Sequence, residues 1–138
     1  MLSRIDHLGI AVRSIEERIG FWTCGLGLTA AHVEVVPTER VRVAMLTVGE
    51  SRIELLEPTS PDSPVAKFLS RRGEGIHHVC FAVEDLEAAL ADLAGKGFRL
   101  VHAAPVEGAD GKRVAFLHPE AGRGVLIELS EEGRKGRP

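Results

Sequence analysis

The sequence predicts an α+β fold that consists of two tandem βαβββ modules related by pseudo-two-fold symmetry. The first observation behind this prediction is a repeat, because the stretch Arg4–Val12 (RIDHLGIAV) recurs as Gly75–Val83 (GIHHVCFAV). One offset of 71 residues (78 − 7) places His7 on His78. Bulky apolar side chains alternate with small or polar ones in both stretches, so each module is expected to begin with a strand.

The second observation is that the repeat continues far downstream. The same offset places Arg42–Leu46 on Arg113–Leu117, and an insertion of three residues (128 − 54 = 74) then brings Ile53–Leu55 onto Ile127–Leu129. Each module therefore contributes one histidine from its first strand and one glutamate from its last. We expect the two modules to form a curled mixed sheet around a cleft that these side chains enter.

The first module is predicted at about 3–58. Ser14 can cap a helix because Glu17 follows it at the spacing of a capping box. One stripe of this helix is apolar and comprises Ile15, Ile19 and Trp22. The expected strands are Arg4–Val12, Leu28–Val36, Val41–Val48 and Ser51–Leu56, of which the last two form a β-hairpin around Gly49-Glu50.

A linker at about 59–73 separates the modules. It is rich in turn formers at Thr59–Pro64 and can form a short helix at Val65–Leu69. The second module, at about 74–130, repeats the plan with strands at Ile76–Val83, Arg99–His102, Arg113–Leu117 and Gly124–Leu129, a helix at Leu86–Lys96 and a turn at Pro119–Gly122.

Length and composition limit the possibilities. A chain of 138 residues with 44% hydrophobic residues can bury one core, so residues 1–138 are expected to form a single domain, with a frayed charged tail at 131–138. The net charge of −3 and the scattered positive residues exclude an electrostatic footprint for nucleic acid or an anionic membrane. A small-molecule partner is therefore expected. Neither a signal peptide nor a membrane span is apparent, and Cys24 and Cys80 lack a paired spacing, which indicates a reduced cytoplasmic protein.

Four polar side chains are candidates for a site: His7, Glu54, His78 and Glu128. Each histidine shares its strand face with small residues, and each glutamate stands between apolar residues that face the opposite way. For any one residue alone, a hydrogen-bonded core histidine or a glutamate on a solvated strand face is the more common reading. For the set the balance reverses, since histidine and carboxylate ligands suit a divalent metal and the repeat places the pairs equivalently. Four ligands leave two octahedral positions for water or substrate.

Four segments are distinctive: Asp62–Leu69 (DSPVAKFL), Gly75–His78 (GIHH), Phe116–Pro119 (FLHP) and Gly124–Leu129 (GVLIEL). They resemble the vicinal oxygen chelate superfamily and, within it, the methylmalonyl-CoA epimerase family. The likeness runs from about Ile5 to Leu129. DSPVAKFL and FLHP are the specific segments, because glyoxalase I shares the His and Glu pattern.

The resemblance implies metal ligands at His7, Glu54, His78 and Glu128, and Co²⁺ as the favoured ion, with Zn²⁺, Ni²⁺ or Mn²⁺ as alternatives. It also implies an isomerase that interconverts (R)- and (S)-methylmalonyl-CoA by α-proton abstraction through a metal-stabilised enolate. Such a reaction needs an acid and a base on opposite faces of the α-carbon. In the family, one is the ligand glutamate of the last strand, here Glu128, and the other is a loop glutamate. A homodimer is also implied.

The loop departs from the family pattern. Family members usually read Glu-Gln-Gly-Val or Glu-His-Gly-Val, where this chain reads Thr38-Glu39-Arg40-Val41. Without a gap, threonine occupies the position of the loop glutamate, and Glu39 follows one residue later. Glu39 is therefore the candidate for the second catalytic base, and a solvated loop glutamate is the equally weighted alternative.

Two further functions are open at this point. One is a glyoxalase I-type lactoylglutathione lyase, with the same metal shell and a glutathione hemithioacetal as substrate. The other is a metal-free relative that only binds a ligand in the cleft. The basic residues that could contact coenzyme A phosphates, or that could merely confer solubility, are Lys67, Arg71, Arg72, Lys112 and Arg113.

Overall fold

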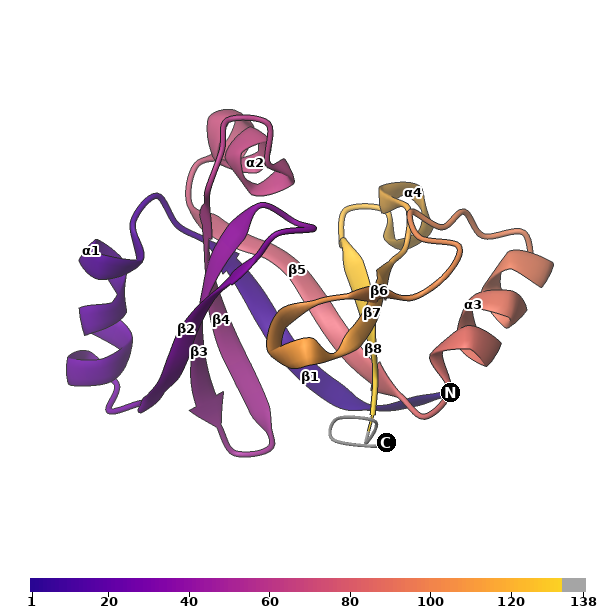
Figure 1. Cartoon of the computed structure of the whole chain (residues 1–138), viewed down its shortest axis with the longest axis horizontal. Helices are drawn as coiled ribbons and strands as arrows, with labels where there is room; N and C mark the ends of the chain where they lie inside the picture. Colours follow the sequence, from indigo (N-terminus) through magenta and orange to yellow (C-terminus); the bar gives the residue numbers. More distant parts are fainter. Residues whose placement is uncertain (133–138) are drawn as a thin grey trace. The chain divides into compact units, whose positions relative to one another are not determined.

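The computed structural model describes residues 1–132. Contacts divide the chain into two compact units (Figure 1). The first-module unit is His7–His77, and the second-module unit combines Met1–Asp6 with the chain from His78 onward. The strands β1 (Leu2–Ala11) and β5 (Gly75–Val83) each begin in one unit and end in the other. The boundaries between these units therefore follow strand packing, whereas the predicted modules follow the repeat.

The sheet of the first-module unit has the strand order β2-β3-β4-β1. Its strands β2 (Ala30–Val36), β3 (Val41–Val48) and β4 (Ser51–Pro58) are antiparallel neighbours, whereas β4 and β1 are parallel. The hairpin predicted between β3 and β4 is confirmed. Gly49 has a φ of 58° at its tip, a left-handed conformation that glycine adopts without a steric penalty.

The helical segment of this unit comprises α1 (Ile15–Gly20), which continues directly into the π-helical turn η1 (Phe21–Gly25). Ser14 caps α1 as the sequence predicts, because its side chain accepts a hydrogen bond from the Glu17 backbone N–H. The predicted apolar stripe packs onto one sheet face. The core cluster on this face comprises Val12, Ile15, Ala44, Leu46 and Leu55, with Ile10, Ile19, Trp22, Leu28 and Ile53 around it.

Helix α2 (Pro64–Arg72) follows the turn-rich linker and is longer than the sequence predicts. Its start is well defined, since the buried Ser63 side chain accepts from Val65 N and proline stands at the first turn. Val65 and Leu69 are buried on the inner side of this helix. Among the described residues, no helix is both long and apolar enough to cross a membrane.

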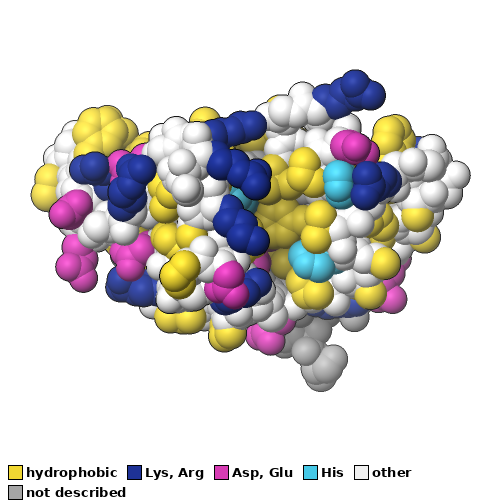
Figure 2. All heavy atoms as spheres, turned by 90° about the horizontal axis from the view of Figure 1, so that it is seen from above, with side chains coloured by type: hydrophobic (Ala, Val, Ile, Leu, Met, Phe, Trp, Pro, Cys, Tyr) yellow, Lys and Arg dark blue, Asp and Glu magenta, His cyan; other side chains and the backbone are white. Residues whose placement is uncertain are grey.

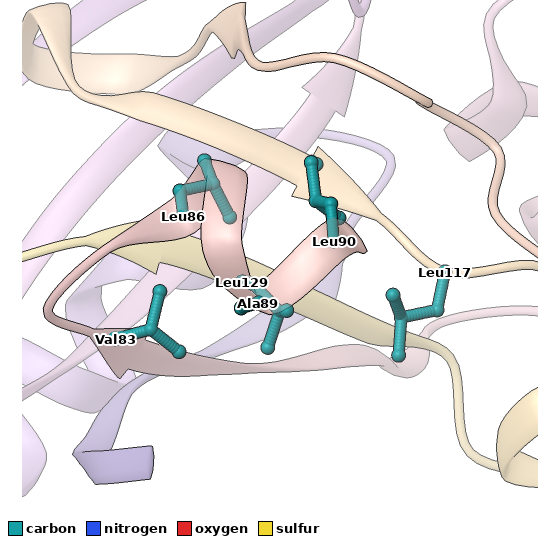
Figure 3. Packing of buried hydrophobic residues seen from close by; sticks show 7 residues of the cluster. Val83, Leu86, Ala89, Leu90, Leu117 and Leu129 are labelled. Carbon is teal, nitrogen blue, oxygen red and sulfur yellow. The ribbon is translucent and has the colours of Figure 1, made fainter. Parts of the chain in front are cut away.

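The second-module unit has the strand order β5-β8-β7-β6. It contains β6 (Val106–Glu107), β7 (Arg113–Phe116) and β8 (Ile127–Glu131), with β5 and β8 parallel and the other pairs antiparallel. The helix α3 (Leu86–Gly95) covers one face of this sheet, and Asp85 caps its N-terminus because its carboxylate accepts from Ala88 N. The second-module unit also contains the short helical turns η2 (Ala109–Gly111) and α4 (Pro119–Gly122). Figure 3 shows the core beneath α3, which comprises Val83, Leu86, Ala89, Leu90, Ala115, Leu117 and Leu129.

The strand predicted at Arg99–His102 is wrong. Leu100 makes only an isolated bridge to Leu117, and the edge strand is instead the short β6. The cause lies in the hydrogen bonds of Phe116. Its backbone N–H donates to the His102 ring nitrogen Nδ1 at 3.0 Å, so a side chain occupies the donor that a regular ladder would use. Its carbonyl accepts from both Val101 and His102, which bends that segment away from a strand.

The tail predicted to start at residue 131 is also wrong at its first position. Glu131 belongs to β8 and is buried. Its carboxylate accepts from the Leu86 backbone N–H at 2.9 Å and lies 3.0 Å from Arg113 Nη1. A buried carboxylate with these partners at a helix N-terminus is satisfied, so the strand extends to it. The prediction is also wrong at Glu132, whose N–H donates to Val83 O at 2.7 Å and whose carboxylate lies 3.2 Å from Arg4 Nε. The predicted tail from residue 133 onward lies outside the described residues.

The first-module unit contains the same arrangement at equivalent positions. Glu57, at the end of β4, accepts from the Ile15 backbone N–H at 2.9 Å and lies 3.1 Å from Arg42 Nη1. Each module thus attaches the end of its last strand to the start of its helix through one carboxylate. This shared anchor extends the internal repeat beyond the motifs seen in the sequence.

The two cores also show which sheet face is left for a site. In the first-module unit, Ile53 and Leu55 of β4 face α1, so Arg52 and Glu54 lie on the opposite face. In the second-module unit, Ile127 and Leu129 of β8 face α3, so Glu128 and Ser130 lie on the face opposite α3. The predicted ligands Glu54 and Glu128 therefore lie on sheet faces that the helices do not cover.

Candidate metal centre

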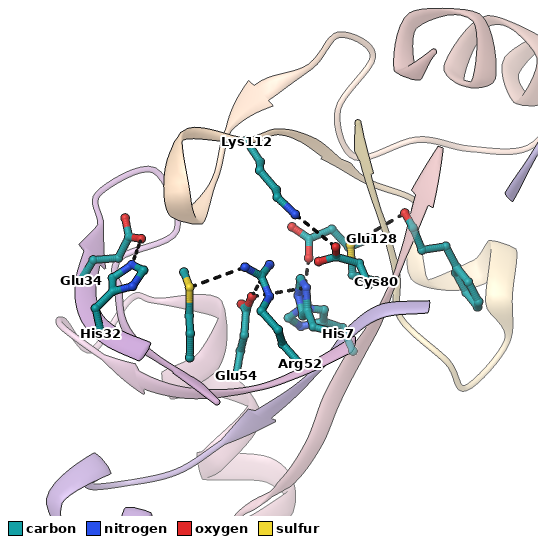
Figure 4. A network of polar contacts seen from close by, with 12 residues as sticks. His7, His32, Glu34, Arg52, Glu54, Cys80, Lys112 and Glu128 are labelled. Carbon is teal, nitrogen blue, oxygen red and sulfur yellow. Dashed lines mark hydrogen bonds and ion pairs between the residues drawn. The ribbon is translucent and has the colours of Figure 1, made fainter. Parts of the chain in front are cut away.

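The first-module unit contains a buried histidine–carboxylate pair. His7 lies on β1 and Glu54 on the parallel strand β4, where Glu54 is the cross-strand partner of Gly9. His7 Nδ1 lies 3.4 Å from Glu54 Oε2, and Arg52 Nη2 lies 3.0 Å from the same oxygen (Figure 4). Gly9 has no side chain to cover Glu54, so the two polar groups can meet across the strands.

The second-module unit contains the equivalent pair. His78 Nε2 on β5 lies 3.1 Å from Glu128 Oε1 on β8, and both side chains are buried. The ring of Phe116 packs edge-on against the His78 ring with the centroids 5.3 Å apart. Cys80 and Phe116 are the cross-strand neighbours of Glu128, which gives the carboxylate largely apolar surroundings. Burying a carboxylate in such surroundings is costly unless a charge or hydrogen bonds compensate it.

The spacing within each pair suits a metal ion. Two ligand atoms about 2.1 Å from one ion and about 90–110° apart are separated by about 3.0–3.4 Å. The separations of 3.4 Å and 3.1 Å lie in or at the limits of this range. Imidazole nitrogen and carboxylate oxygen are also ligands that Co²⁺, Zn²⁺, Ni²⁺ and Mn²⁺ accept. Each pair, taken by itself, therefore fits two neighbouring ligands of one divalent ion.

The candidate second base, Glu39, lies in the turn between β2 and β3. The turn is closed by hydrogen bonds from Glu39 N to Val36 O and from Arg40 N to Pro37 O, both 3.2 Å. Arg40 has a φ of 53°, the left-handed conformation in which glycine is least strained, and its guanidinium pairs with Asp62 at 2.6 Å. The turn therefore forms without the glycine of the family pattern. The position of Glu39 in this turn leaves its role as the second base a prediction.

Sequence analysis missed two charged residues beside the pairs. Arg52 contacts Glu54 directly, and the alternation of β4 could have revealed it, because residues two apart in a strand share a face. Asp6 is buried beside His7 in the sequence, and its carboxylate lies 3.1 Å from Lys112 Nζ and 3.3 Å from Arg4 Nη1. The spacing of two residues places Arg4 and Asp6 on one face of β1, whereas the partner Lys112 lies too far along the chain for a local pattern to indicate it.

The basic residues named for coenzyme A divide into two groups. Lys112 and Arg113 are engaged in ion pairs with Asp6 and Glu131, respectively. The other three are exposed on α2: Lys67, Arg71 and Arg72. Figure 2 views the side of the molecule on which α2 lies in Figure 1 and shows Lys and Arg side chains gathered there. This helix is the better candidate surface for an anionic cofactor group.

Comparison with known proteins identifies the family. The family model of the glyoxalase/bleomycin resistance protein/dioxygenase superfamily matches residues 6–116. The mitochondrial methylmalonyl-CoA epimerase of Mus musculus is 37% identical over 131 residues, which cover 94% of this chain and 74% of the relative. The chain belongs to the methylmalonyl-CoA epimerase family of this superfamily.

Two further members of the family agree with it in length and structure. The ethylmalonyl-CoA/methylmalonyl-CoA epimerase of Cereibacter sphaeroides is 38% identical over 133 residues, which cover 95% of this chain and 99% of the relative. The structure of a methylmalonyl-CoA epimerase in complex with methylmalonyl-CoA and NH4+ has a TM-score of 0.93 at 40% identity and covers 100% of both chains. The predicted α+β vicinal oxygen chelate fold is thus confirmed for this epimerase family member.

Proposed function

We propose that this chain is an epimerase that interconverts (R)- and (S)-methylmalonyl-CoA and depends on a divalent metal. The observation that carries the proposal is the presence, in a member of this family, of a buried His–Glu pair at equivalent positions of both modules. The relatives named methylmalonyl-CoA epimerase match 94% and 95% of this chain, which supports the proposal.

The proposed ligands are His7, Glu54, His78 and Glu128. The pair spacings and the mixed nitrogen and oxygen donors support this set, and the family resemblance favours Co²⁺ among the possible ions. When bound, a divalent ion supplies positive charge that stabilises the negative charge developing on the thioester oxygen as the α-proton leaves.

The chain's own residues then have to move the proton. We assign Glu128 to one face of the α-carbon, where a carboxylate oxygen takes or returns the proton. Its position on β8 between cross-strand neighbours Cys80 and Phe116 limits the access of water and holds the carboxylate in place. Inversion of the centre needs a second carboxylate or equivalent group on the opposite face, and Glu39 is the proposed residue.

The variant Glu39→Gln tests whether Glu39 transfers a proton on the face of the α-carbon opposite Glu128. If Glu39 is the second base, this variant keeps metal affinity and loses epimerisation, while Glu128 still exchanges the α-proton of one epimer with solvent. Exchange then outpaces inversion. An unaltered epimerisation rate removes Glu39 from the mechanism, and Thr38, which aligns with the family glutamate when no gap is allowed, is then the next residue to test. Thr38→Val is the matched variant for that outcome.

The experiment that tests the function is proton exchange at the α-carbon of methylmalonyl-CoA in deuterated water, with and without added Co²⁺. Metal-dependent deuterium incorporation with loss of optical activity is expected. The hemithioacetal of glutathione serves as the competing substrate for a glyoxalase I-type reaction. Turnover of that substrate with no exchange in methylmalonyl-CoA would contradict the proposal.

Two finer expectations belong to the same proposal. A homodimer is supported by apolar side chains exposed at the start of β1, namely Met1, Leu2 and Ile5, which a second copy would cover. A reducing compartment such as the cytoplasm is supported by the described cysteines, since neither Cys24 nor Cys80 is part of a disulfide.

A further inference from the structure

Arg52 lies next to the first ligand pair. It is the cross-strand partner of His7 in the β1–β4 ladder and shares a sheet face with Glu54. Its side chain is 19% exposed, whereas that of Glu54 is 4% exposed. The side chain of Arg52 is therefore more accessible to solvent than the carboxylate that it contacts.

Two contacts of the guanidinium bear on the binding of a second anion. Nη2 lies 3.0 Å from Glu54 Oε2, and Nη1 donates to the Met45 sulfur at 3.7 Å. A thioether sulfur is a weak acceptor, so exchanging it for a carboxylate oxygen strengthens the hydrogen bond. The planar fork of a guanidinium matches the two oxygens of a carboxylate, a geometry that a lysine ammonium lacks.

The charges of the proposed site also favour a substrate that carries a carboxylate. With a divalent ion and neutral histidines, the proposed site contains the ion, the guanidinium of Arg52 and the carboxylates of Glu54 and Glu128. One positive charge is left over, and a substrate with one free carboxylate neutralises it. A thioester without that carboxylate leaves the charge uncompensated in a largely buried site.

We propose that Arg52 is a specificity-determining residue that binds the free carboxylate of malonyl-type acyl-CoA thioesters. The inference rests on the proposed function and names the substrate class of that site. Arg52 does not exchange a proton in this role. It orients the malonyl group and disfavours coenzyme A thioesters whose acyl chain ends in a methyl group.

A purely structural role for Arg52 predicts different effects of its removal on Co²⁺ binding and thioester binding. If the guanidinium only holds Glu54 in position, its removal disturbs the metal ligand first, and Co²⁺ binding suffers together with the binding of every thioester. If it recognises the substrate carboxylate, its removal affects only thioesters that carry one. Metal affinity and thioester preference therefore separate the two roles.

The test compares Arg52→Gln and Arg52→Lys with the wild-type protein. Arg42→Gln is the matched control, because Arg42 lies on the α1 side of the same sheet and pairs with Glu57. Calorimetry measures the affinity for Co²⁺ alone, and then the affinities of the Co²⁺-loaded proteins for methylmalonyl-CoA and for propionyl-CoA, which differ by the carboxylate.

We expect Arg52→Gln to weaken methylmalonyl-CoA binding by about 10- to 100-fold, the usual effect of losing a charge-assisted hydrogen bond. Propionyl-CoA binding stays within about twofold, Co²⁺ affinity is maintained or rises, and Arg52→Lys recovers part of the loss. The control keeps wild-type affinities. An equal loss for both thioesters, or a collapse of Co²⁺ affinity, overturns the inference and makes Arg52 a positioning residue for Glu54.

The same measurements distinguish this inference from the proposed function. A wild-type protein that prefers methylmalonyl-CoA over propionyl-CoA but does not epimerise it retains the role of Arg52 and refutes the epimerase assignment. A wild-type protein that epimerises methylmalonyl-CoA without any preference in binding refutes the role of Arg52 alone.

Discussion

Removal of the anchoring carboxylate should destabilise the two modules to different extents. Glu131 and Glu57 make the same contacts, each to a helix N-terminal N–H and to an arginine. Their environments differ, because the side chain of Glu131 is 2% exposed and that of Glu57 is 22% exposed. We therefore compare Glu131→Ala with Glu57→Ala as a pair matched by the internal repeat.

The difference can be worked out from the hydrogen bonds. Glu131→Ala leaves the N–H of the buried Leu86 without its acceptor, which costs about 1–3 kcal/mol, and removes a negative charge from the start of α3, worth up to about 1 kcal/mol. The total is about 3 kcal/mol. The bond from Ile15 to Glu57 is only partly buried, so water can replace the carboxylate and the loss falls to about 1 kcal/mol.

Thermal unfolding followed by circular dichroism, with chelator present, measures both effects. For a chain of this length each kcal/mol shifts Tm by about 3 °C, so Glu131→Ala should lower Tm by about 10 °C and Glu57→Ala by about 3 °C. Glu87→Ala is the control, because Glu87 also pairs with Arg113 but is 68% exposed, and it should change Tm by less than about 2 °C. Equal losses in the two anchor variants would refute the link between burial and cost.

Three further predictions concern the metal, a buried hydroxyl and assembly. His78→Ala should weaken Co²⁺ binding by at least about 100-fold in calorimetry. His77→Ala should retain the affinity for Co²⁺, because His77 lies on the opposite face of β5 and packs against Phe68. Full Co²⁺ affinity in His78→Ala excludes the proposed ligand set. Ser130→Ala should raise Tm by about 3 °C, because among the described residues the buried Ser130 hydroxyl has no hydrogen-bond partner, and a lower Tm would indicate an acceptor or a bound water at that hydroxyl. Sedimentation equilibrium at micromolar concentration should give the mass of a dimer, and a monomer mass rejects the proposed assembly.

The internal repeat and strand alternation were sufficient to predict most of the fold. Apolar alternation located β1, β3, β4 and β5 within a few residues, since a one-residue error would expose a whole apolar face. The same alternation placed each histidine and its glutamate on the face opposite the helix, and the structure brings His7 to Glu54 and His78 to Glu128. The joint coordination of one ion by all four remains a proposal.

The wrong predictions at residues 99–102 and at Glu131 have a common physical cause, which is contacts between residues far apart in the sequence. The segment around His102 reads as a strand by local propensity, but the His102 ring takes the Phe116 N–H and ends regular pairing there. Glu131 reads as the first residue of a charged tail, but it joins β8 because Leu86 N and Arg113 satisfy its carboxylate. Local sequence patterns do not indicate such distant partners. The internal repeat does indicate that Glu131 is equivalent to Glu57, because the two are separated by the same offset (131 − 57 = 74) as Glu54 and Glu128.

The last strand of each module carries two glutamates with different tasks. In β4, Glu54 points to the site face and Glu57 to the α1 face, because a spacing of three residues places side chains on opposite sides of a strand. β8 repeats the arrangement with Glu128 and Glu131. A slip of one residue would exchange the faces and bury the ligand carboxylate against the helix. The anchor between Glu57 or Glu131 and the helix N-terminus opposes that slip, so the contact that stabilises each module also fixes the register of its metal ligand.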